Sequence, residues 1–319
     1  MTVIGYTMMC EQAGPKQLVA DVQHAEAAGF DFAVISDHFS PWLDAMGHSP
    51  YAWSVLGAAA QATSRIELMT YVTCPIKRYH PAIVAQKAAT VGVLSDGRFT
   101  LGLGAGENLN EHVTGGGWPP VNVRHQMLEE AVDIIRSLWT GEYVNYDGRH
   151  FQVDSAKLWD LPEDPLKLGI AASGGQSSKL AGGKGDCLIA VEPKAEIVAA
   201  FEAAGGDGKP RIGQLPVSYD RDRDTAVARA LEMFSWFGGG WKVNSELPST
   251  AAFKSASSFV RGSDIADSIP CGDSVEQVVT AVKEFASAGF THVALCQIGH
   301  EQGAFIEWWE RELAPALRT

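Results

Sequence analysis

Two short clusters of polar residues in this chain have the composition needed for proton transfer. Asp37 and His38 directly follow one apolar run, and Glu107 and Glu111 follow another, which ends in alternating glycines. A histidine beside a carboxylate can have its tautomer and charge set for proton transfer near neutral pH. Glycines at the end of a strand let the backbone adopt positive φ or approach a flat ligand closely. These residues indicate acid–base chemistry beside a flat ligand, although a loop histidine and a tight turn with solvated carboxylates would leave the same pattern.

Other apolar runs in the chain end in similar polar or glycine-containing segments. They contribute Glu11, Tyr71 to Thr73, Ser173 to Gly175, Lys194, and Gly299 with His300. The carboxyl ends of parallel strands meet at one mouth of a barrel or one edge of a sheet. If the strands are parallel, these distant residues converge on one site, and that convergence is a stronger indication than any single motif.

The elements that would position these residues alternate between strand and helix. Near-continuous apolar runs predict strands at residues 3–7, 32–35, 66–71, 99–103, 166–171, 187–191, 212–219 and 292–296. Helical spacing, or a proline at a first turn, predicts helices at about residues 18–28, 51–63, 81–94, 121–139, 275–288 and 305–317. About eight strands, each followed by a helix, predict an α/β fold of the (β/α)8 TIM barrel type. An open doubly wound sheet is the alternative, and the absence of G-x-G-x-x-G after the first strand disfavours it.

Two segments depart from this alternation. Residues 144–153 predict a hairpin with its turn at Asp147 and Gly148. Residues from about 220 to 270 are less regular and contain three consecutive glycines beside aromatic residues. We interpret this stretch as an insertion in one barrel domain spanning residues 1–319 rather than as a second domain.

The composition limits the classes of partner. The 319 residues are 46% hydrophobic, and the formal net charge of −13 argues against nonspecific nucleic-acid binding and against an anionic membrane surface. The five cysteines are far apart and lack C-x-x-C spacing, so neither a disulfide framework nor a zinc site is indicated. No signal peptide or membrane-spanning run is recognisable, and we expect a soluble cytoplasmic protein.

The chain lacks the sequence motifs that are typical of several kinds of chemistry. No H-E-x-x-H or facial-triad spacing is present, so no metal site is predicted. The chain also lacks a G-x-S-x-G elbow and a Walker loop, which argues against hydrolase and P-loop functions. Ser173 to Gly175 precede a predicted helix whose first N–H groups would favour a phosphate. The same sequence pattern is also common in ordinary turns. Lys194 and Lys254 would bring cations toward the mouth if residues 220–270 fold over it, and are otherwise solvated.

Three motifs give the chain a resemblance to a known family. They are S-D-H-F at residues 36–39, G-A-G-E-N-L-N-E at 104–111 and A-A-S-G-G at 171–175. The chain resembles bacterial luciferase-like oxidoreductases, and more narrowly the branch that holds the deazaflavin coenzyme F420 and includes the F420-dependent glucose-6-phosphate dehydrogenases. The resemblance runs from about residue 3 to residue 317. It implies a (β/α)8 barrel, usually a homodimer, with the tricyclic ring in the mouth beside a small-molecule substrate.

The resemblance also implies roles for individual residues. His38 would be the base that takes the hydroxyl proton of an alcohol, and Glu107 the acid near the ring or the stabiliser of the imidazolium. Trp42 would line the pocket beside the reacting carbon, and we place Glu11 with these catalytic candidates. We expect His38 and Glu107 on opposite sides of the migrating hydrogen, with a slot between them for three fused rings. A deazaflavin carries two electrons as a hydride, so orientation, a base and a charged wall would suffice without a metal.

The coenzyme would contact residues from several strand ends. The resemblance places a non-prolyl cis peptide between Tyr71 and Val72, against the ring. The residues that it implies for coenzyme binding are Asp37, Tyr71, Val72, Thr73, Ala105, Gly106, Asn110, Ala172, Ser173, Gly174, Gly175 and Gln176. The last five of these would receive the phosphate.

Alternatives remain for both the substrate and the cofactor. In the sugar-phosphate branch two lysines and an arginine hold the substrate phosphate, and Lys194 and Lys254 match the lysines. The arginine position falls near Asp267, in a segment without a basic residue, and Arg261 is the nearest candidate to replace it. Loss of one charged contact would weaken the binding of glucose 6-phosphate. Another sugar phosphate or an unphosphorylated alcohol therefore remains a possible substrate. The rival functions are an FMN-dependent luciferase-like monooxygenase and a barrel that binds a flavin-like ligand without catalysis.

Overall fold

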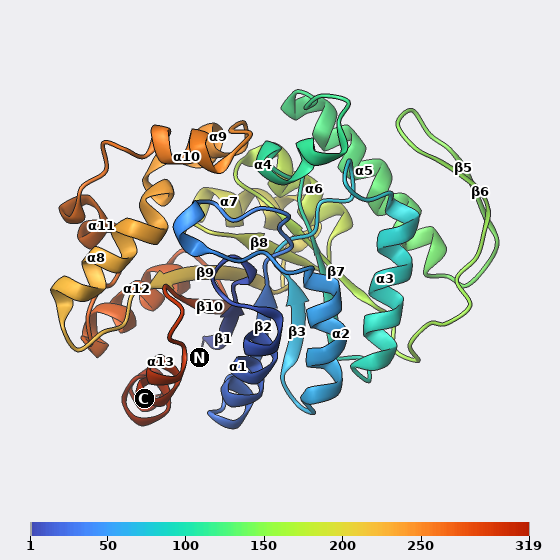
Figure 1. Ribbon diagram of the computed structural model, residues 1–319. Coiled ribbons are helices and arrows are strands. Elements are labelled where there is room, and N and C mark those ends of the chain that lie inside the picture. The colour runs from blue at the N-terminus through green and yellow to red at the C-terminus, as the bar shows by residue number, and fades with distance from the viewer. Residues whose placement is uncertain (1, 319) are drawn as a thin grey trace.

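The computed structural model describes residues 2–318, which form a closed barrel of parallel strands (Figure 1). Around the barrel the strands follow the order β1-β10-β9-β8-β7-β4-β3-β2. The eight strands are β1 (Val3–Met8), β2 (Phe32–Ile35), β3 (Glu67–Thr70), β4 (Phe99–Leu103), β7 (Lys167–Ala171), β8 (Cys187–Ala190), β9 (Arg211–Val217) and β10 (His292–Gln297). The predicted (β/α)8 fold is therefore confirmed.

The strands have nearly continuous apolar sequences because both of their faces are covered. In β2, Phe32 and Val34 belong to one apolar cluster, whereas Ala33 and Ile35 belong to the larger cluster that includes helix residues. Successive side chains of a strand point to opposite faces, and in a barrel one face meets the interior and the other the helices. All four residues of β2 are consequently buried.

Helices surround the barrel on its outer side (Figure 1). They are α1 (Pro15–Ala27), α2 (Ala52–Ala62), α3 (Pro81–Leu94), α5 (Val121–Leu138), α6 (Gly175–Lys184), α7 (Ala195–Phe201) with its π turn η4 (Glu202–Gly206), and α12 (Val275–Ser287). The C-terminal run, predicted as one helix, consists of α13 (Gly303–Trp308), the π turn η6 (Trp309–Leu313) and α14 (Ala314–Arg318). Short helical turns follow three of the strands, and these are η1 (Cys10–Gln12), η2 (Asp44–Met46), α4 (Asn108–Glu111) and η3 (His112–Thr114).

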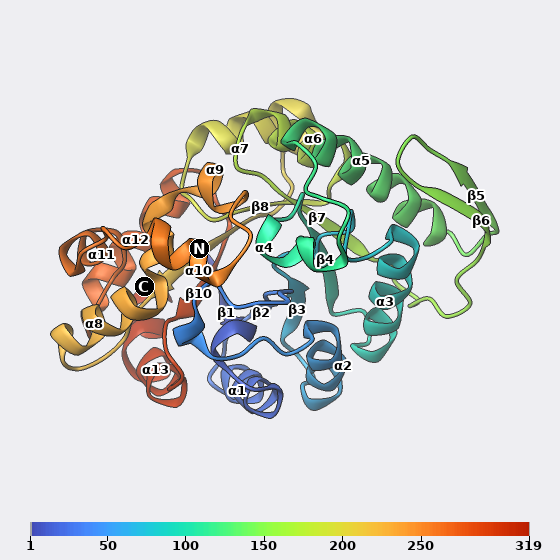
Figure 2. The ribbon, with the colours of Figure 1, turned by 45° about the horizontal axis from the view of Figure 1, so that its top comes forward.

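Residues 220–270, expected to be an insertion, fold as a group of short helices. These are α8 (Arg223–Phe234), η5 (Ser235–Gly239), α9 (Trp241–Asn244), α10 (Thr250–Ala256) and α11 (Gly262–Ser268). Their buried side chains form a second apolar cluster with residues that follow β2, among them Trp42 and Met46. Figures 1 and 2 both show α9 close to α4. The segment thus approaches the mouth of the barrel from the end of β9.

Polar contacts join this segment to α4 and α5. The Ser245 carbonyl accepts hydrogen bonds from Asn108 N (3.0 Å) and Trp118 Nε1 (3.1 Å). Glu246 forms an ion pair with Arg124 of α5 at 2.8 Å. Because α4 follows β4 and the segment follows β9, these contacts connect loops from separate parts of the mouth.

The hairpin outside the barrel differs in detail from its prediction. β5 (Val144–Asp147) and β6 (Gln152–Ala156) are antiparallel, and Asp147 pairs with Gln152, so four residues rather than two form the loop. The Glu130 carboxylate on α5 accepts hydrogen bonds from the backbone N–H groups of three loop residues. A contact from another element therefore stabilises the wider turn, and local turn preferences do not include such contacts.

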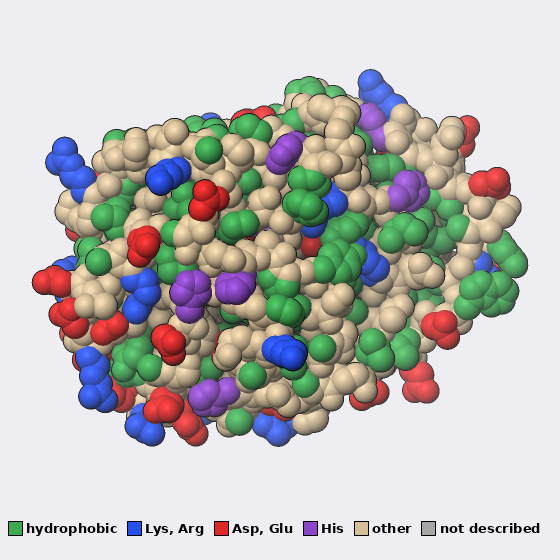
Figure 3. Space-filling model, in the orientation of Figure 1, with side chains coloured by type: hydrophobic (Ala, Val, Ile, Leu, Met, Phe, Trp, Pro, Cys, Tyr) green, Lys and Arg blue, Asp and Glu red, His purple; other side chains and the backbone are tan. Residues whose placement is uncertain are grey.

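The surface charges and the buried cysteines are typical of a globular protein. Figure 3 shows basic and acidic side chains scattered over one face of the molecule, without a continuous basic patch on that face. Among residues 2–318, no helix combines the length and the apolarity needed to cross a bilayer. All five cysteines are buried and free, so the thiols act as small hydrophobic core residues.

Candidate active site

Side chains from three strand ends meet around His38 at the mouth of the barrel. His38 follows β2, Glu11 lies in η1 after β1, and Glu107 lies between β4 and α4. His38 Nδ1 is 2.9 Å from Glu11 Oε1, and His38 Nε2 is 3.3 Å from Glu107 Oε1. The imidazole therefore lies between two carboxylates, each facing one ring nitrogen.

The two carboxylates around His38 differ in their exposure. Glu11 is fully buried, and Ser36 Oγ donates a hydrogen bond to its Oε2 (2.5 Å). The Glu107 side chain keeps 13% of its surface exposed. Nδ1 is therefore enclosed by protein, and Nε2 is the ring nitrogen on the accessible side. In the described part of the chain, no group of three or more His, Cys, Asp or Glu residues could hold a metal ion.

The charges around His38 determine its protonation state. Burial alone would lower the pKa of His38, but the carboxylates of Glu11 and Glu107 outweigh burial and raise that pKa to about 9. Burial also tends to raise the pKa of Glu11, yet His38 and Ser36 outweigh it and hold the pKa of this carboxyl below its usual value. The two carboxylates therefore favour the imidazolium form of His38 at neutral pH.

The expectation that His38 and Glu107 face each other across a slot for three fused rings is wrong, because their side chains are in contact. Asn110 explains the difference. Its Nδ2 donates to Glu107 Oε1 (2.5 Å), and its Oδ1 accepts from Phe39 N (2.8 Å) and Ser40 N (3.0 Å). The fully buried Asn110 thus draws Glu107 toward the loop of His38. A flat ring can lie only beside the pair, with both side chains on the same side.

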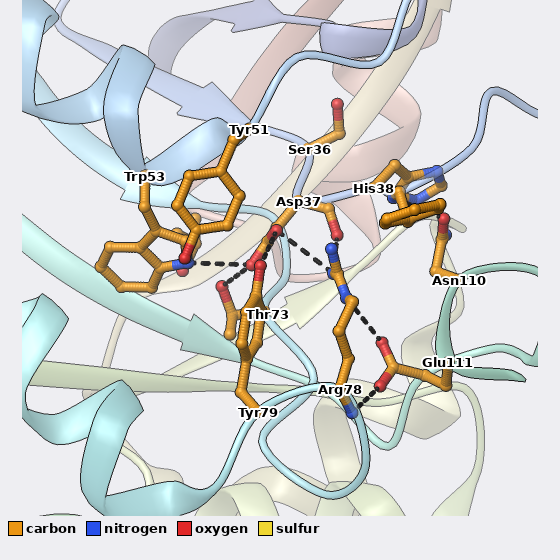
Figure 4. A network of polar contacts seen from close by, with 12 residues as sticks. Ser36, Asp37, His38, Tyr51, Trp53, Thr73, Arg78, Tyr79, Asn110 and Glu111 are labelled. Carbon is orange, nitrogen blue, oxygen red and sulfur yellow. Dashed lines mark hydrogen bonds and ion pairs between the residues drawn. The ribbon is translucent and has the colours of Figure 1, made fainter. Parts of the chain in front are cut away.

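Asp37 precedes His38, but its carboxylate lies in a buried polar network (Figure 4). Its oxygens accept hydrogen bonds from four side chains, which are Trp53 Nε1 (2.9 Å), Thr73 Oγ1 (2.7 Å), Arg78 NH2 (3.2 Å) and Tyr79 Oη (3.2 Å). The carboxylate predicted to contact the coenzyme is thus saturated by the protein, and the Thr73 hydroxyl is turned toward it. A coenzyme contact from this carboxylate would require one of the four donors to leave.

Arg78, which no sequence motif indicated, completes this network. Arg78 Nε lies 3.4 Å from Glu111 Oε1, and Arg78 N donates to Glu111 Oε2 (2.8 Å). Burial raises the pKa of the Glu111 carboxyl to about 7, although Arg78 acts against this rise. No motif surrounds Arg78, and only its place shortly after a predicted strand end could have indicated it.

Two neighbouring strands, β3 and β4, end at the mouth in Tyr71, Val72 and a glycine-rich segment. The Tyr71–Val72 peptide is cis, as predicted. A Cβ at Gly104 would lie 2.5 Å from Val72 Cγ2, and Gly106 has a φ of 74°, so a side chain fits poorly at either position. Tyr71, Val72, Ala105 and Gly106 are all partly exposed. Partly exposed residues therefore border the mouth here, and the glycines leave room for a flat ligand to approach the backbone.

The predicted phosphate seat lies at the N-terminus of α6. Ala172 is buried, Gly174 is half-buried, and Ser173, Gly175 and Gln176 are exposed. A Cβ added at Gly174 or Gly175 would meet nothing within 4 Å, so the space around the two glycines is open. The first N–H groups of a helix lack partners within the helix and attract anions. These donors fit a phosphate group.

Aromatic rings surround Trp42, the residue predicted to line the substrate pocket. The centroid of Trp42 lies 4.8 Å from that of His38, and Trp42 stacks on Trp236 at 4.2 Å. Phe253 meets Trp42 edge-on at 5.1 Å. Trp236 and Phe253 come from residues 220–270, and sequence reasoning did not connect them with the site. The only available signal was the cluster of aromatic residues beside three glycines.

The two lysines predicted to bind substrate lie outside this aromatic group. Lys194 Nζ pairs with Glu192 Oε2 at 2.8 Å, and both side chains are nearly half exposed. Lys254 is exposed on α10, where its neighbour Phe253 is the buried residue. Within residues 2–318, neither lysine forms a hydrogen bond or ion pair with the side chains around His38. The structure therefore shows no phosphate site assembled from them.

Comparisons with known proteins agree with this fold. The family described as luciferase-like monooxygenase matches residues 2–292. An F420-dependent glucose-6-phosphate dehydrogenase of Tsukamurella paurometabola is 35% identical over 340 residues, which cover 99% of this chain and 98% of that protein. Another, from Kribbella flavida, is 36% identical over 337 residues, with 99% and 98% coverage.

A solved structure is also closely similar. It is an F420-dependent secondary alcohol dehydrogenase in complex with an F420–acetone adduct, with a TM-score of 0.92 and 32% identity over 100% of this chain and 99% of that one. The barrel, its polar mouth and these matches define the class of protein. The chain belongs to the luciferase-like family. The predicted resemblance to the F420-dependent branch of that family is confirmed by the named relatives.

Proposed function

We propose that this protein is an oxidoreductase that transfers a hydride between the CH–OH carbon of a small molecule and coenzyme F420. The observation that carries the proposal is His38, held between Glu11 and Glu107 in a barrel whose relatives are named F420-dependent dehydrogenases. Oxidation of an alcohol removes a hydride from carbon and a proton from oxygen. The coenzyme, when bound, supplies the hydride acceptor, and the side chains of this chain must handle the proton.

The residues at the mouth fit the flat ring and the phosphate of this coenzyme. The residues that would hold the ring are partly exposed at the ends of β3 and β4, and they are Tyr71, Val72, Ala105 and Gly106. Residues 172–176 would hold the phosphate through the N–H groups at the start of α6. The other residues predicted to contact the coenzyme already form hydrogen bonds within the protein, and they would stabilise this surface rather than bind the ring. They are Asp37, Thr73 and Asn110.

His38 Nε2 is the atom that we propose exchanges the hydroxyl proton with the substrate. Nδ1 faces the buried Glu11, which keeps the ring in one orientation and stabilises its positive charge. Nε2 faces Glu107, whose side chain is partly exposed, so a proton accepted at Nε2 can pass to Glu107 and then to water. Trp42 meets His38 edge-on and would exclude water from the reacting carbon.

The pKa of His38 determines how alcohol oxidation and carbonyl reduction each depend on pH. With a pKa of about 9, roughly 1% of the imidazole is neutral at pH 7. Alcohol oxidation needs the neutral base and accelerates as the pH rises toward 9, whereas carbonyl reduction needs the imidazolium and slows above 9. At neutral pH the site is therefore prepared to donate a proton, as carbonyl reduction requires.

The substrate class that we propose is a small unphosphorylated alcohol and its ketone. Trp42 and Trp236 give the substrate side an aromatic wall, which favours apolar substituents. Lys194 is already paired with Glu192, and the third cation of the sugar-phosphate pattern is missing near Asp267. A bound phosphate would lack the charge-assisted hydrogen bonds that compensate for its desolvation.

A sugar phosphate is the second candidate, because the curated relatives are named glucose-6-phosphate dehydrogenases. Lys194 and Lys254 stand where that pattern has lysines. An exposed ion pair such as Lys194 with Glu192 is weak, so the lysine could turn to a phosphate. Arg261, exposed at the start of α11, could add a third charge.

The visible absorbance of F420 tests both candidates. The purified protein is mixed with oxidised F420 and 2-propanol, glucose 6-phosphate or glucose, and with reduced F420 and acetone. Reaction with 2-propanol and acetone, and none with glucose 6-phosphate, supports the proposal. Bleaching by glucose 6-phosphate alone would replace the substrate class and keep the hydride transfer. No reaction with any substrate, together with tight FMN binding and no F420 binding, would overturn the proposed function.

A further inference from the structure

We propose that Arg78, acting with Glu111, is a positioning residue that fixes the separation and orientation of His38 and Glu107. The inference rests on the proposed function, because it names a residue that acts on the proton-transfer pair without touching the substrate. Arg78 lies between β3 and α3, and its side chain is only 8% exposed. A charge buried to this extent must have partners that hold it in place.

The guanidinium of Arg78 joins two segments of the mouth (Figure 4). Its NH2 group donates to Asp37 O (2.5 Å) and to Asp37 Oδ1 (3.2 Å), directly before His38. Its Nε pairs with Glu111 Oε1 at 3.4 Å, and its backbone N–H donates to Glu111 Oε2 at 2.8 Å. One residue therefore connects the loop of His38 with α4, the helix that follows Glu107.

Asn110 makes a second connection between the same two segments. It accepts hydrogen bonds from the N–H groups of Phe39 and Ser40, directly after His38, and donates to Glu107. His38 thus lies between a carbonyl held by Arg78 and two N–H groups held by Asn110. Its backbone is fixed from both sides, and with it the 3.3 Å separation between His38 and Glu107.

Arginine is suited to this place and lysine is not. A planar guanidinium presents several donors in a fork, so it can bind a carbonyl and two carboxylates together, whereas an ammonium is a compact point charge. Burial would lower the pKa of Arg78, but Asp37 and Glu111 outweigh burial and hold that pKa above its usual value. The guanidinium therefore stays charged throughout the pH range of the reaction.

The charge of Arg78 also acts on His38. The charged groups that act on the imidazole are Glu11 of η1 and Glu107, which raise its pKa, and Arg78, which lowers it. Asp37 and Glu111 are both paired with Arg78. Removal of the Arg78 charge should therefore move the proton loss of His38 to higher pH. This shift reports the charge of Arg78, whereas a loss of kcat in a variant that keeps the charge reports its geometry.

Three variants of the full chain separate charge from geometry. Arg78→Met removes both the charge and the fork, and Arg78→Lys keeps only the charge. Arg98→Lys is the matched control, because Arg98 is also partly buried and donates to the carbonyls of Ala60, Thr63 and Ile66. Arg98 directly precedes β4, at the opposite end of that strand from Glu107.

The proton loss of His38 is followed by NMR of its imidazole, and kcat and the Kd of F420 are measured separately. We expect kcat of Arg78→Lys to fall about 100-fold with little change in Kd, because a displacement of about 1 Å at reacting groups has an effect of this size. The NMR inflection should stay near the wild-type pH in Arg78→Lys and move to higher pH in Arg78→Met. Arg98→Lys should lower only Tm.

Glu111→Gln provides a second variant should Arg78→Met fail to fold, because it loosens the contact with α4 and keeps Asp37 paired. We expect its kcat to fall about tenfold, for the same positional reason. Unchanged kcat in both Arg78→Lys and Glu111→Gln would overturn the proposal, as would equal losses of kcat in Arg78→Lys and Arg98→Lys. If the wild-type protein does not reduce F420, the proposed function fails, while the NMR inflection still tests the action of Arg78 on His38.

Discussion

The two sides of the barrel mouth hold their charged side chains in different ways. On the side formed by the ends of β1 to β4, Glu11, Asp37 and Glu111 are at most 2% exposed, and each is paired with a buried partner. On the side formed by the ends of β8 and β9, Lys194 pairs only with the nearby Glu192, and both remain nearly half exposed. The first arrangement is fixed by its surroundings, and the second is free to change.

This difference follows from desolvation. A buried charge without a partner is strongly unfavourable, so burial imposes a specific geometry on the groups that share it. An exposed ion pair contributes only about 0–1 kcal/mol and rearranges easily. We therefore propose that the first side serves proton transfer at His38, and that the second side, where the partly exposed Trp236 stacks on Trp42, contacts the substrate.

Replacement of His38 should cause the largest loss of activity among changes on the first side of the mouth. We expect His38→Ala to lower kcat by about 10²–10⁴-fold, the range for loss of a positioned acid or base, with F420 affinity little changed. Steady-state F420 reduction and fluorescence titration of F420 measure the two effects. His24→Ala, which changes an exposed histidine on α1, is the control. Full activity in His38→Ala would exclude this imidazole as the proton-transfer group.

The pH profile shows whether Glu11 controls His38. Because the His38 pKa is raised to about 9, wild-type alcohol oxidation should rise with pH up to about 9, and ketone reduction should fall above it. Glu11→Gln removes a charge that raises this pKa, so the inflection should move down by about 1–3 pH units. Glu310→Gln, at an exposed carboxylate, should leave it in place. An inflection that stays near 9 in Glu11→Gln contradicts the account.

The aromatic wall on the second side is tested by Trp236→Ala. Loss of a stacked indole removes apolar contact area, so KM for 2-propanol or a larger secondary alcohol should rise roughly tenfold, with a smaller change in kcat. Trp159→Ala removes a tryptophan that is 76% exposed and should leave KM unchanged. Equal kinetics in the two variants would show that Trp236 does not contact the substrate.

The smallest effect is expected for the two exposed lysines. Lys194→Ala and Lys254→Ala should each change kcat/KM for an unphosphorylated alcohol by less than about twofold, because exposed charges contribute little. The measurement is repeated with glucose 6-phosphate and glucose. A loss of about tenfold or more, confined to the phosphorylated sugar, would assign these lysines to a phosphate and reverse the substrate preference.

The sequence predicted the framework well where local patterns determine it. The predicted helix 81–94 coincides with α3, since Pro81 is suited to a first helical turn and the run that follows is apolar. The convergence of Glu11, His38 and Glu107 at the mouth was also predicted, because the carboxyl ends of parallel barrel strands must converge. Both inferences depend on patterns of neighbouring residues.

Features that depend on contacts between distant residues were missed or wrong. Arg78 carries no motif, and its importance appears only when Asp37 and Glu111 are seen on either side of it. The contact of His38 with Glu107 arises from the hydrogen bonds of Asn110, which no spacing rule describes. The insertion boundary, the homodimer and the cytoplasmic location stay predictions.

Transfer of deuterium tests the central claim most directly. The protein is incubated with oxidised F420 and 2-propanol deuterated at carbon 2, and the mass of the coenzyme is measured together with its absorbance. The account predicts bleaching of F420, one deuterium on the coenzyme from the carbon of the alcohol, and a strongly reduced rate in His38→Ala. Bleaching without deuterium in the coenzyme, or transfer at an unchanged rate in His38→Ala, would contradict it.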